Sequence, residues 1–448
     1  KQRKRTQAVI DPRGRMVEAM RASVGEQGYT TTVVADVIAK AVASRKTFYE
    51  HFEDKHACFF ALSDEIAREW EERVERAVGP AVEESEDGTS NGDGAPEDPI
   101  GALVDELFDL ALESPAALRV LAVELTAAGP TGIERRERAL EGLARPFAAA
   151  LGEDAADGEL LPRAIVGAIL RILYARARRG ARVRRPRRAD LLELAPELAA
   201  WAARYKRGIR AASGRPSTRG VGAQVPVGGR APGTLSLGSR AIERRGLPRG
   251  EGNVSRSFVV HNQRERILDA LANLSAAKGY GATTIPEIVQ EAAVSVQAFY
   301  EHFSGKEDAF LVAYELGHRK ALAIVERAYE SQEDWPAAVR AGIAALLEFL
   351  ASEPAYAHLA LIDAMTASPR AAAMAHEGMR SYAAMLEPGL ELSANGHPPT
   401  AVSVEATAGT LLELCFVYVA TEQTRELPSL AVLAEDIALR PFAGVSVP

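Results

Sequence analysis

The stretch GYTTTVVADVIAKAVASRKTFYEHFEDKHACFF, residues 28–60, returns later in the chain as GYGATTIPEIVQEAAVSVQAFYEHFSGKEDAFL, residues 279–311. The two stretches align without a gap, and 12 of their 33 residue pairs are identical. Their longest shared run is the pentapeptide FYEHF, at residues 48–52 and 299–303. Two copies so far apart indicate a duplicated domain, because a solenoid needs three or more short repeats.

Each copy of the repeat is expected to be helical. Apolar residues recur at helical spacing over residues 16–26 and again over residues 267–274, and a glycine that favours the end of a helix follows each run. No segment of the chain alternates polar and apolar residues for long enough to form a strand. We therefore predict an all-α protein with two tandem units, each opened by a small three-helix domain.

The repeated stretch predicts two short helices joined by a tight turn. The first short helix ends near Ala41 or Ala292, and threonine hydroxyls before it are able to cap it; the threonines are Thr31, Thr32, Thr283 and Thr284. Ser44 or Ser295 caps the second short helix. This order of elements is that of a helix-turn-helix DNA-binding domain, called a reader below. Many helical domains share the pattern, so the residue types must support the interpretation.

The residues of the repeat resemble the N-terminal DNA-binding domain of the TetR (tetracycline repressor) family. The resemblance rests on Gly-Tyr, Thr-Thr, Ala-x-x-Ser and Phe-Tyr-Glu-His-Phe followed by Lys, at a spacing that both copies keep. It covers the regions near 14–62 and 264–314, and the rest resembles the family's helical ligand-binding and dimerisation domain in length, helicity and tail pattern. The resemblance implies a ligand-responsive transcriptional regulator, expected to be a repressor, with double-stranded operator DNA and a small-molecule effector as partners.

Composition and resemblance together predict five segments. Residues 207–256 hold ten basic residues against two acids and are rich in Gly, Ser and Pro, which indicates a linker. Residues 83–98 hold seven acids and no base and indicate a solvated loop. The predicted segments are a first reader at 1–62, a first helical domain at 63–206, a basic linker at 207–261, a second reader at 262–314 and a second helical domain at 315–448.

In the first unit, the helix after Ser44 is expected to enter the major groove of DNA. Its first turn carries Arg45, Lys46 and Thr47, which can donate to guanine or place a methyl group on thymine. The resemblance implies phosphate contacts for Tyr49 and His51, although either side chain could instead pack against the domain. Lys55 would add a charge near the DNA backbone, together with the N-terminus of the next helix. The threonines before the short helices and the capping serines complete the set of candidate DNA-binding residues: Thr31, Thr32, Ser44, Thr283, Thr284 and Ser295.

The second unit departs from the first in its recognition turn, which after Ser295 reads Val296-Gln297-Ala298 and carries no positive charge. Gln297 can still pair with adenine, and Val296 can touch a thymine methyl group. Tyr300, His302 and Lys306 occupy the places of the first unit's predicted phosphate contacts. Because phosphate neutralisation supplies most non-specific affinity, we expect the second reader to bind DNA more weakly. Both turns lack the glycine that the family often has there.

The two helical domains are expected to pair with each other. In the TetR family the final two helices form a four-helix bundle with the same pair of a second unit, and here the final helices are predicted at residues 191–206 and 429–440. A flexible linker over 207–261 spans roughly 40 Å and gives a local concentration of about millimolar. We predict a pseudo-dimer within one chain, with a homodimer as the alternative.

The effector site is predicted only through candidate residues. Glu124 and Asp363 lie in otherwise apolar helical runs, where a carboxylate could bind a cationic or hydroxylated ligand, or could pair with a nearby arginine such as Arg119. The other candidates are Tyr174, His358, Tyr382 and Tyr418, whose tyrosines could equally belong to the core. The sequence leaves the identity of the ligand open.

Composition and motif content exclude other classes of protein. The chain has 448 residues, of which 47% are hydrophobic and 25% charged, as in soluble globular proteins. No apolar run reaches the ~18 residues of a membrane helix, and Cys58 and Cys415 are too few for a disulfide scaffold. We expect a cytoplasmic protein that has no membrane segment, cofactor or metal.

An enzyme is not predicted, because there is no phosphate-binding glycine loop after a strand, no metal-ligand spacing among the eight histidines and no Ser, His and acid set. The formal charge of −8 does not exclude DNA, because it averages acidic and basic segments. The remaining alternative is a duplicated helical protein-interaction scaffold that has lost specific DNA binding.

Overall fold

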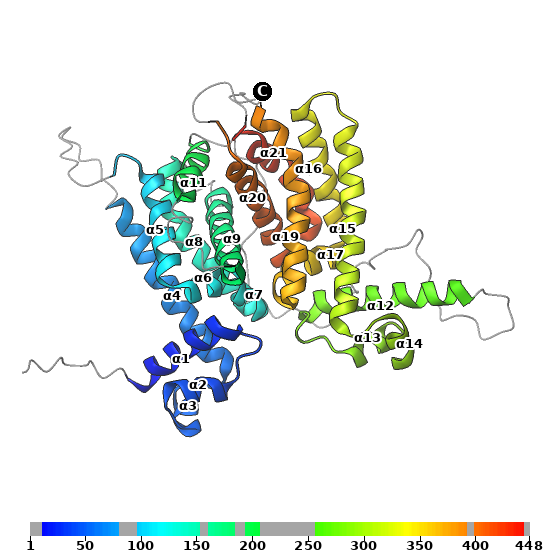
Figure 1. The fold of residues 1–448 in the computed structure, drawn as a ribbon, viewed down its shortest axis with the longest axis horizontal. Coiled ribbons are helices and arrows are strands. Elements are labelled where there is room, and N and C mark those ends of the chain that lie inside the picture. Colours follow the sequence, from blue (N-terminus) through cyan, green and yellow to red (C-terminus); the bar gives the residue numbers. More distant parts are fainter. Residues whose placement is uncertain are drawn as a thin grey trace, which may run out of the picture. The chain divides into compact units, whose positions relative to one another are not determined.

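A computed structural model of the chain describes residues 11–79, 96–152, 160–183, 193–206, 256–391 and 398–442, with the backbone alone for 178–183 and 256–260. Over these ranges every regular element is a helix and no strand occurs, which confirms the all-α fold (Figure 1). The first ten residues, most of the acidic loop and the linker up to residue 255 lie outside the described residues. The chain divides into two compact units, Lys1–Phe147 with Leu170–Pro196 and Ala148–Ile169 with Glu197–Pro448.

The first reader consists of α1 (Pro12–Gln27), α2 (Val34–Ala41) and α3 (Arg45–His51), and the long helix α4 (Lys55–Val78) follows it (Figure 1). Helix α1 begins after Asp11, whose Oδ1 accepts the Gly14 amide at 2.7 Å. Pro12 occupies the first turn, where its missing N–H removes no helical bond. The helix buries one face against α2 and α4, with Met16, Val17, Met20 and Val24 at its centre.

The second reader repeats this order with α12 (Arg256–Lys278), α13 (Ile285–Glu291) and α14 (Val296–His302), followed by α15 (Lys306–Glu330). Helix α12 begins at Arg256, so residues 256–261 of the predicted linker are helical. The two phenylalanines of each FYEHF repeat are buried, and they hold the recognition helix on the reader's core.

The predicted threonine caps are correct in one reader only. In the second reader Thr284 is the N-cap of α13, and its amide and hydroxyl donate to Glu287 at 2.9 and 2.6 Å. In the first reader the N-cap of α2 is Val33, whose amide donates to Asp36 at 3.0 Å, so a carboxylate supplies the cap.

Both helix-turn-helix turns keep their geometry without glycine. Val42 and Ala293 each have φ of 50°, in the left-handed region where a Cβ is unfavourable. In the second reader Arg266 donates to the carbonyl oxygens of Ala292 and Ala293, which holds the carbonyl groups of this turn in place. Within the described residues, no arginine donates to the carbonyl oxygens of the turn in the first reader.

In the first half of the chain, the helices after the reader begin with α5 (Pro99–Glu113) and α6 (Pro115–Arg119). A π-helical turn, η1 (Val120–Glu124), and the short α7 (Leu125–Ala127) continue α6, and α8 (Pro130–Leu151) and α9 (Leu160–Val183) follow. The second half of the chain has the equivalent series α16 (Trp335–Ser352), α17 (Pro354–His358), η2 (Leu359–Asp363), α18 (Ala364–Ala367) and α19 (Pro369–Ala383). The series ends with η3 (Ala384–Glu391), α20 (Ala401–Ala420), η4 (Thr424–Leu430) and α21 (Ala431–Leu439).

The compact second unit includes a helix that precedes the linker. In α11 (Leu194–Ala203), the Trp201 Nε1 donates to the Thr407 hydroxyl of α20 at 3.0 Å, and just beyond it the Tyr205 hydroxyl donates to the Ile437 carbonyl oxygen of α21 at 3.0 Å. Both aromatic side chains are fully buried. The predicted domain boundary at residue 206 therefore does not coincide with a boundary between compact units.

Two helices, α16 and α20, are long and apolar enough to cross a membrane by length and composition, which the sequence analysis did not anticipate. Of the most apolar 18-residue stretch of α20, 83% is buried inside the structure, as expected of a core helix. The corresponding share for α16 is 33%. Helix α16 packs on α15, η4 and α21 along its buried side.

Candidate nucleic-acid interface

The recognition helix of the first reader presents its predicted base-contacting side chains to solvent. Arg45 and Lys46 are exposed, and Thr47 is half-buried. Ser44 is the N-cap, and its Oγ accepts the Thr47 amide at 3.0 Å, so its predicted capping role is confirmed. The Arg45 guanidinium lies 5.9 Å from the centroid of the Tyr49 ring, which keeps both groups on one exposed surface.

The first turn of the recognition helix of the second reader presents no charged side chain. Val296 and Tyr300 are 50% and 56% exposed. Gln297 is also exposed, and its Nε2 donates to Glu301 at 3.1 Å. Ala298, the third residue of this turn and not a candidate DNA contact, is buried.

The two histidines of the repeat differ in their surroundings. His51 is exposed, whereas His302 is half-buried and its Nε2 atom has no hydrogen-bond partner. Burial lowers the pKa of His302, and the nearby Arg264 lowers it further. The predicted phosphate contact is therefore geometrically open for His51 and hindered for His302.

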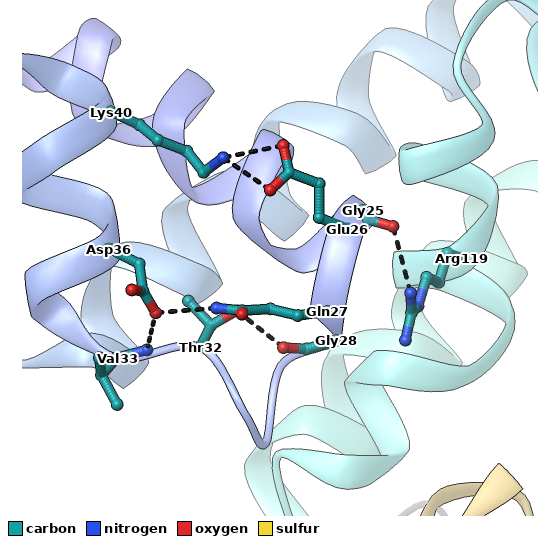
Figure 2. A network of polar contacts seen from close by, with 9 residues as sticks. All are labelled: Gly25, Glu26, Gln27, Gly28, Thr32, Val33, Asp36, Lys40 and Arg119. Carbon is teal, nitrogen blue, oxygen red and sulfur yellow. Dashed lines mark hydrogen bonds and ion pairs between the residues drawn. The ribbon is translucent and has the colours of Figure 1, made fainter.

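Two of the threonines predicted to bind DNA are turned inward. Thr32 and Thr283 are buried, and their hydroxyls donate to the carbonyl oxygens of Gly28 and Gly279 at 2.7 and 3.0 Å (Figure 2 shows the first pair). These bonds complete the turn after the first helix of each reader, so the structure replaces the predicted DNA contact with an internal one. Thr31 and Thr284 remain exposed.

The lysines predicted to contact phosphate are partly engaged inside the protein. The Lys55 Nζ donates to the Tyr29 carbonyl oxygen at 3.1 Å, and the Lys306 Nζ donates to the carbonyl oxygens of Tyr280 and Thr283 at 2.9 and 2.8 Å. Burial lowers the pKa of both ammonium groups. An ammonium group has three donors, so Lys55 and Lys306 each keep at least one N–H beyond the bonds named here.

A further base near the first reader is neutralised locally. The Lys40 Nζ donates to both carboxylate oxygens of Glu26 at 2.8 and 2.7 Å, and beside this pair Asp36 accepts from the Gln27 side chain and the Val33 amide (Figure 2). These bonds lower the pKa of Asp36, with the Val33 amide as the largest cause. On the recognition helix of this reader Arg45 and Lys46 are exposed, and the Lys46 Nζ lies 3.8 Å from the Glu50 Oε1.

The carboxylates proposed for an effector site lie instead where each reader meets its helical domain. Glu124 is buried, and its Oε1 accepts from the Arg119 Nε at 2.6 Å, as the alternative of a pairing with arginine required. Its Oε2 accepts the Tyr29 backbone amide at 2.8 Å. In the second unit the buried Asp363 accepts the Tyr280 amide at 3.0 Å and lies 3.1 Å from the His358 Nδ1.

The tyrosines proposed for the effector site are not brought together. Tyr418 is buried in α20 beside Glu426 and Ser429, and Tyr174 is buried in α9. Tyr382 lies instead in an aromatic cluster of the second unit, 3.4 Å from the His318 Nδ1 through its hydroxyl. The sequence analysis missed three members of this cluster: Tyr314, His318 and Tyr356. The spacing of Tyr314 and His318, four residues apart on α15, was the available signal.

Comparison with known proteins matches both readers to one family of DNA-binding domains. The family described as "Bacterial regulatory proteins, tetR family" matches residues 17–62 and 267–313. A segment of 56 residues is 45% identical to the "Uncharacterized HTH-type transcriptional regulator YerO" of Bacillus subtilis (strain 168). This match covers 12% of the chain and 19% of that relative, so the chain spans about a fifth of the relative's length. Both family matches contain a complete recognition helix.

Proposed function

We propose that this chain, a TetR-family transcriptional regulator with two helix-turn-helix domains in tandem, acts as a single-chain pseudo-dimer on an asymmetric operator. An effector bound in the helical part would release the DNA, so the chain would act as a repressor. It would work in the cytoplasm, with DNA and a small molecule as partners and without a cofactor or a reaction of its own.

The observation that carries the proposal is the difference between the two recognition surfaces. The first offers Arg45 and Lys46, which suit guanine, and the second offers Val296 and Gln297, which suit thymine and adenine. A symmetric dimer places two identical helices on a palindrome. Two unlike helices on one chain therefore favour one strong half-site, containing guanine, and one weaker half-site.

Support for pairing within the chain comes from the composition of the second compact unit. Trp201 and Tyr205 precede the linker in sequence but are buried against α20 and α21. In the same unit, a Cβ built on Gly167 of α9 would lie 2.8 Å from Glu413 of α20, which indicates close packing of these two helices. Such packing within one chain supports pairing of its two halves.

The experiment is selection of bound sequences from a random DNA pool. We expect two unlike half-sites at fixed spacing, with more information in the arm read by Arg45 and Lys46. Recovery of a perfect palindrome would instead mean that two chains bind through their first readers. The variant Arg45→Ala should erase the preference in the strong arm alone, because each good bidentate contact discriminates by ~1–3 kcal/mol.

A further inference from the structure

Each reader is joined to its helical domain by a buried carboxylate at the last residue of a π-helical turn. The carboxylates are Glu124 in η1 and Asp363 in η2. A π-helical turn inserts a residue into a helix, and such turns are frequent at functional sites. The same irregularity, with an acid at the same position, occurs in both units, and an equivalent proline precedes each run, Pro115 in the first and Pro354 in the second. We call each carboxylate, with the groups bonded to it, an anchor.

The first anchor links three elements through one carboxylate. Glu124 accepts the amide of Tyr29, which follows the C-cap Gly28 of α1, and pairs with Arg119 of α6. The Arg119 Nη1 also donates to the Gly25 carbonyl oxygen in the last turn of α1 at 3.2 Å (Figure 2). Lys55, the first residue of α4, donates to the Tyr29 carbonyl oxygen. The chain of bonds therefore runs from η1 to the residue that follows the recognition helix and its turn.

The second anchor has the same path but weaker chemistry. Asp363 accepts the Tyr280 amide, and Lys306 donates to the Tyr280 carbonyl oxygen. The partner of the carboxylate is His358 in place of an arginine. Within the described residues this anchor therefore lacks both a permanent positive charge and a second bond to the first helix of its reader, α12. A Cβ built on Gly279 would meet no atom within 4 Å, whereas one on Gly28 would lie 2.7 Å from the Arg119 Nη2. The second anchor is thus open where the first is closed.

We propose that Glu124 and Asp363 are positioning residues that fix each reader on its helical domain, and that the anchor of the second reader is the weaker of the two. The bond to the tyrosine amide is charge-assisted, and such bonds are stronger than neutral ones. A rearrangement of the π-helical turn would move the tyrosine and, through its carbonyl oxygen, the start of the following helix. The inference rests on the proposed function only for its consequence in DNA binding.

The test on the free protein is hydrogen exchange at the two tyrosine amides. Glu124→Gln keeps the shape of the side chain and removes its charge, so exchange at Tyr29 should accelerate about tenfold or more relative to wild type. Asp363→Asn should accelerate exchange at Tyr280 less, because that anchor is already the weaker one. The control is Asp334→Asn, since Asp334 accepts the Ala337 amide at 2.9 Å as an ordinary N-cap of α16. It should leave both tyrosine amides unchanged.

A variant that strengthens the second anchor distinguishes a local effect from unfolding, because unfolding would accelerate exchange and a stronger anchor should slow it. The double substitution His358→Arg with Asp363→Glu gives the second anchor the chemistry of the first, and the open space beside Gly279 can accept the longer arginine. We expect slower exchange at Tyr280 in this variant. Unchanged exchange at Tyr29 in Glu124→Gln, or a uniform acceleration over all of α1–α3, would overturn the inference, because neither result is that of a local anchor.

The consequence for DNA is measured with the sequence recovered from the random pool. Loss of the first anchor frees the orientation of the reader, so Glu124→Gln should weaken binding to the two-half-site DNA about tenfold while binding to unrelated DNA is unchanged. If wild type and variants bind no DNA at all, the proposed function fails, and the anchors are then judged by hydrogen exchange alone. Equal losses on both kinds of DNA would contradict a positioning role.

Discussion

The ammonium group of Lys55 lies 4.2 Å from the centroid of the Tyr29 ring and 3.1 Å from the Tyr29 carbonyl oxygen. Lys306 repeats both contacts with Tyr280, at 4.1 and 2.9 Å. A lysine expected to neutralise phosphate is therefore first of all a bond within the reader. Tyr29 in turn places its hydroxyl 2.6 Å from the His56 Nδ1, so the start of α4 is held to the end of α1 by both lysine and histidine.

This contact predicts different roles for two lysines of the first reader. Lys46 is 87% exposed through its side chain, so Lys46→Ala should lower the slope of log affinity against log salt by about 1. Lys55→Met should lower that slope by less and should lower the melting temperature, because it leaves the Tyr29 carbonyl oxygen without its lysine donor. Salt titrations of DNA binding and thermal melts measure the two effects. Equal changes in slope with unchanged stability would show that Lys55 serves the DNA instead.

The reader was predictable from sequence because its pattern is local. The FYEHF repeat, the serine caps and the helix order depend on residues within a few turns of each other, and all are confirmed. The inward turn of Thr32 and Thr283 was not predictable, because a threonine before a helix suits either a cap or a bond to the preceding glycine carbonyl. Only the burial of the side chain decides between these two.

The anchors and the aromatic cluster depend on contacts between residues far apart in sequence. The sequence marks Glu124 as an acid in an apolar run and places Arg119 near enough to pair with it. The bond of Glu124 to Tyr29, in contrast, joins positions that no local pattern connects. The placing of Trp201 beside Thr407 is likewise a matter of tertiary packing. The sequence therefore identified Glu124 and Asp363 as unusual, but the structure bonds them to tyrosine amides of the readers.

The left-handed turn residues predict stabilising substitutions. Val42 has φ of 50° and is 85% exposed, so Val42→Gly relieves a strain of about 1–2 kcal/mol without losing buried surface. After the entropy that glycine adds to the unfolded chain, about 0.5–1 kcal/mol, the first reader should gain about 1 kcal/mol. Ala293→Gly should gain less, because alanine has no β-branch. Thermal melts measure both variants. The control is Ala39→Gly, at an exposed position within α2, and it should destabilise the reader.

The glycines that end the first helix of each reader predict unequal costs. Gly28 and Gly279 have φ of 87° and 83°, so an alanine at either position should cost about 1–3 kcal/mol in strain. Gly28→Ala should cost more, because its Cβ would lie 2.7 Å from the Arg119 Nη2 and 3.1 Å from the Glu124 Oε1. Denaturant unfolding compares the two variants. A larger cost at Gly279 would contradict the closed packing of the first anchor.

The aromatic cluster of the second unit predicts a loss of stability in mild acid. His318 stacks on Tyr314 with ring centroids 6.0 Å apart and meets Tyr382 edge-on at 5.4 Å, and burial lowers the pKa of its imidazole, while Glu326 opposes this weakly. The unfolded chain therefore binds a proton on this histidine at a higher pH than the folded chain does. The free energy of unfolding should be constant above the ordinary histidine pKa and should fall as the pH is lowered through it.

The measurement is the melting temperature of the full chain between pH 7.5 and 5.5, a range above the titration of ordinary carboxylates. His318→Phe keeps a ring between Tyr314 and Tyr382 but cannot take up a proton, so its melting temperature should depend less on pH than that of wild type. His302, whose pKa burial also lowers, adds to the same trend and remains in both proteins. His51→Phe is the matched control, because it makes the same substitution at an exposed histidine, and it should leave the pH dependence as in wild type. A wild-type chain that gains stability as the pH falls through this range would contradict the buried, neutral state of His318.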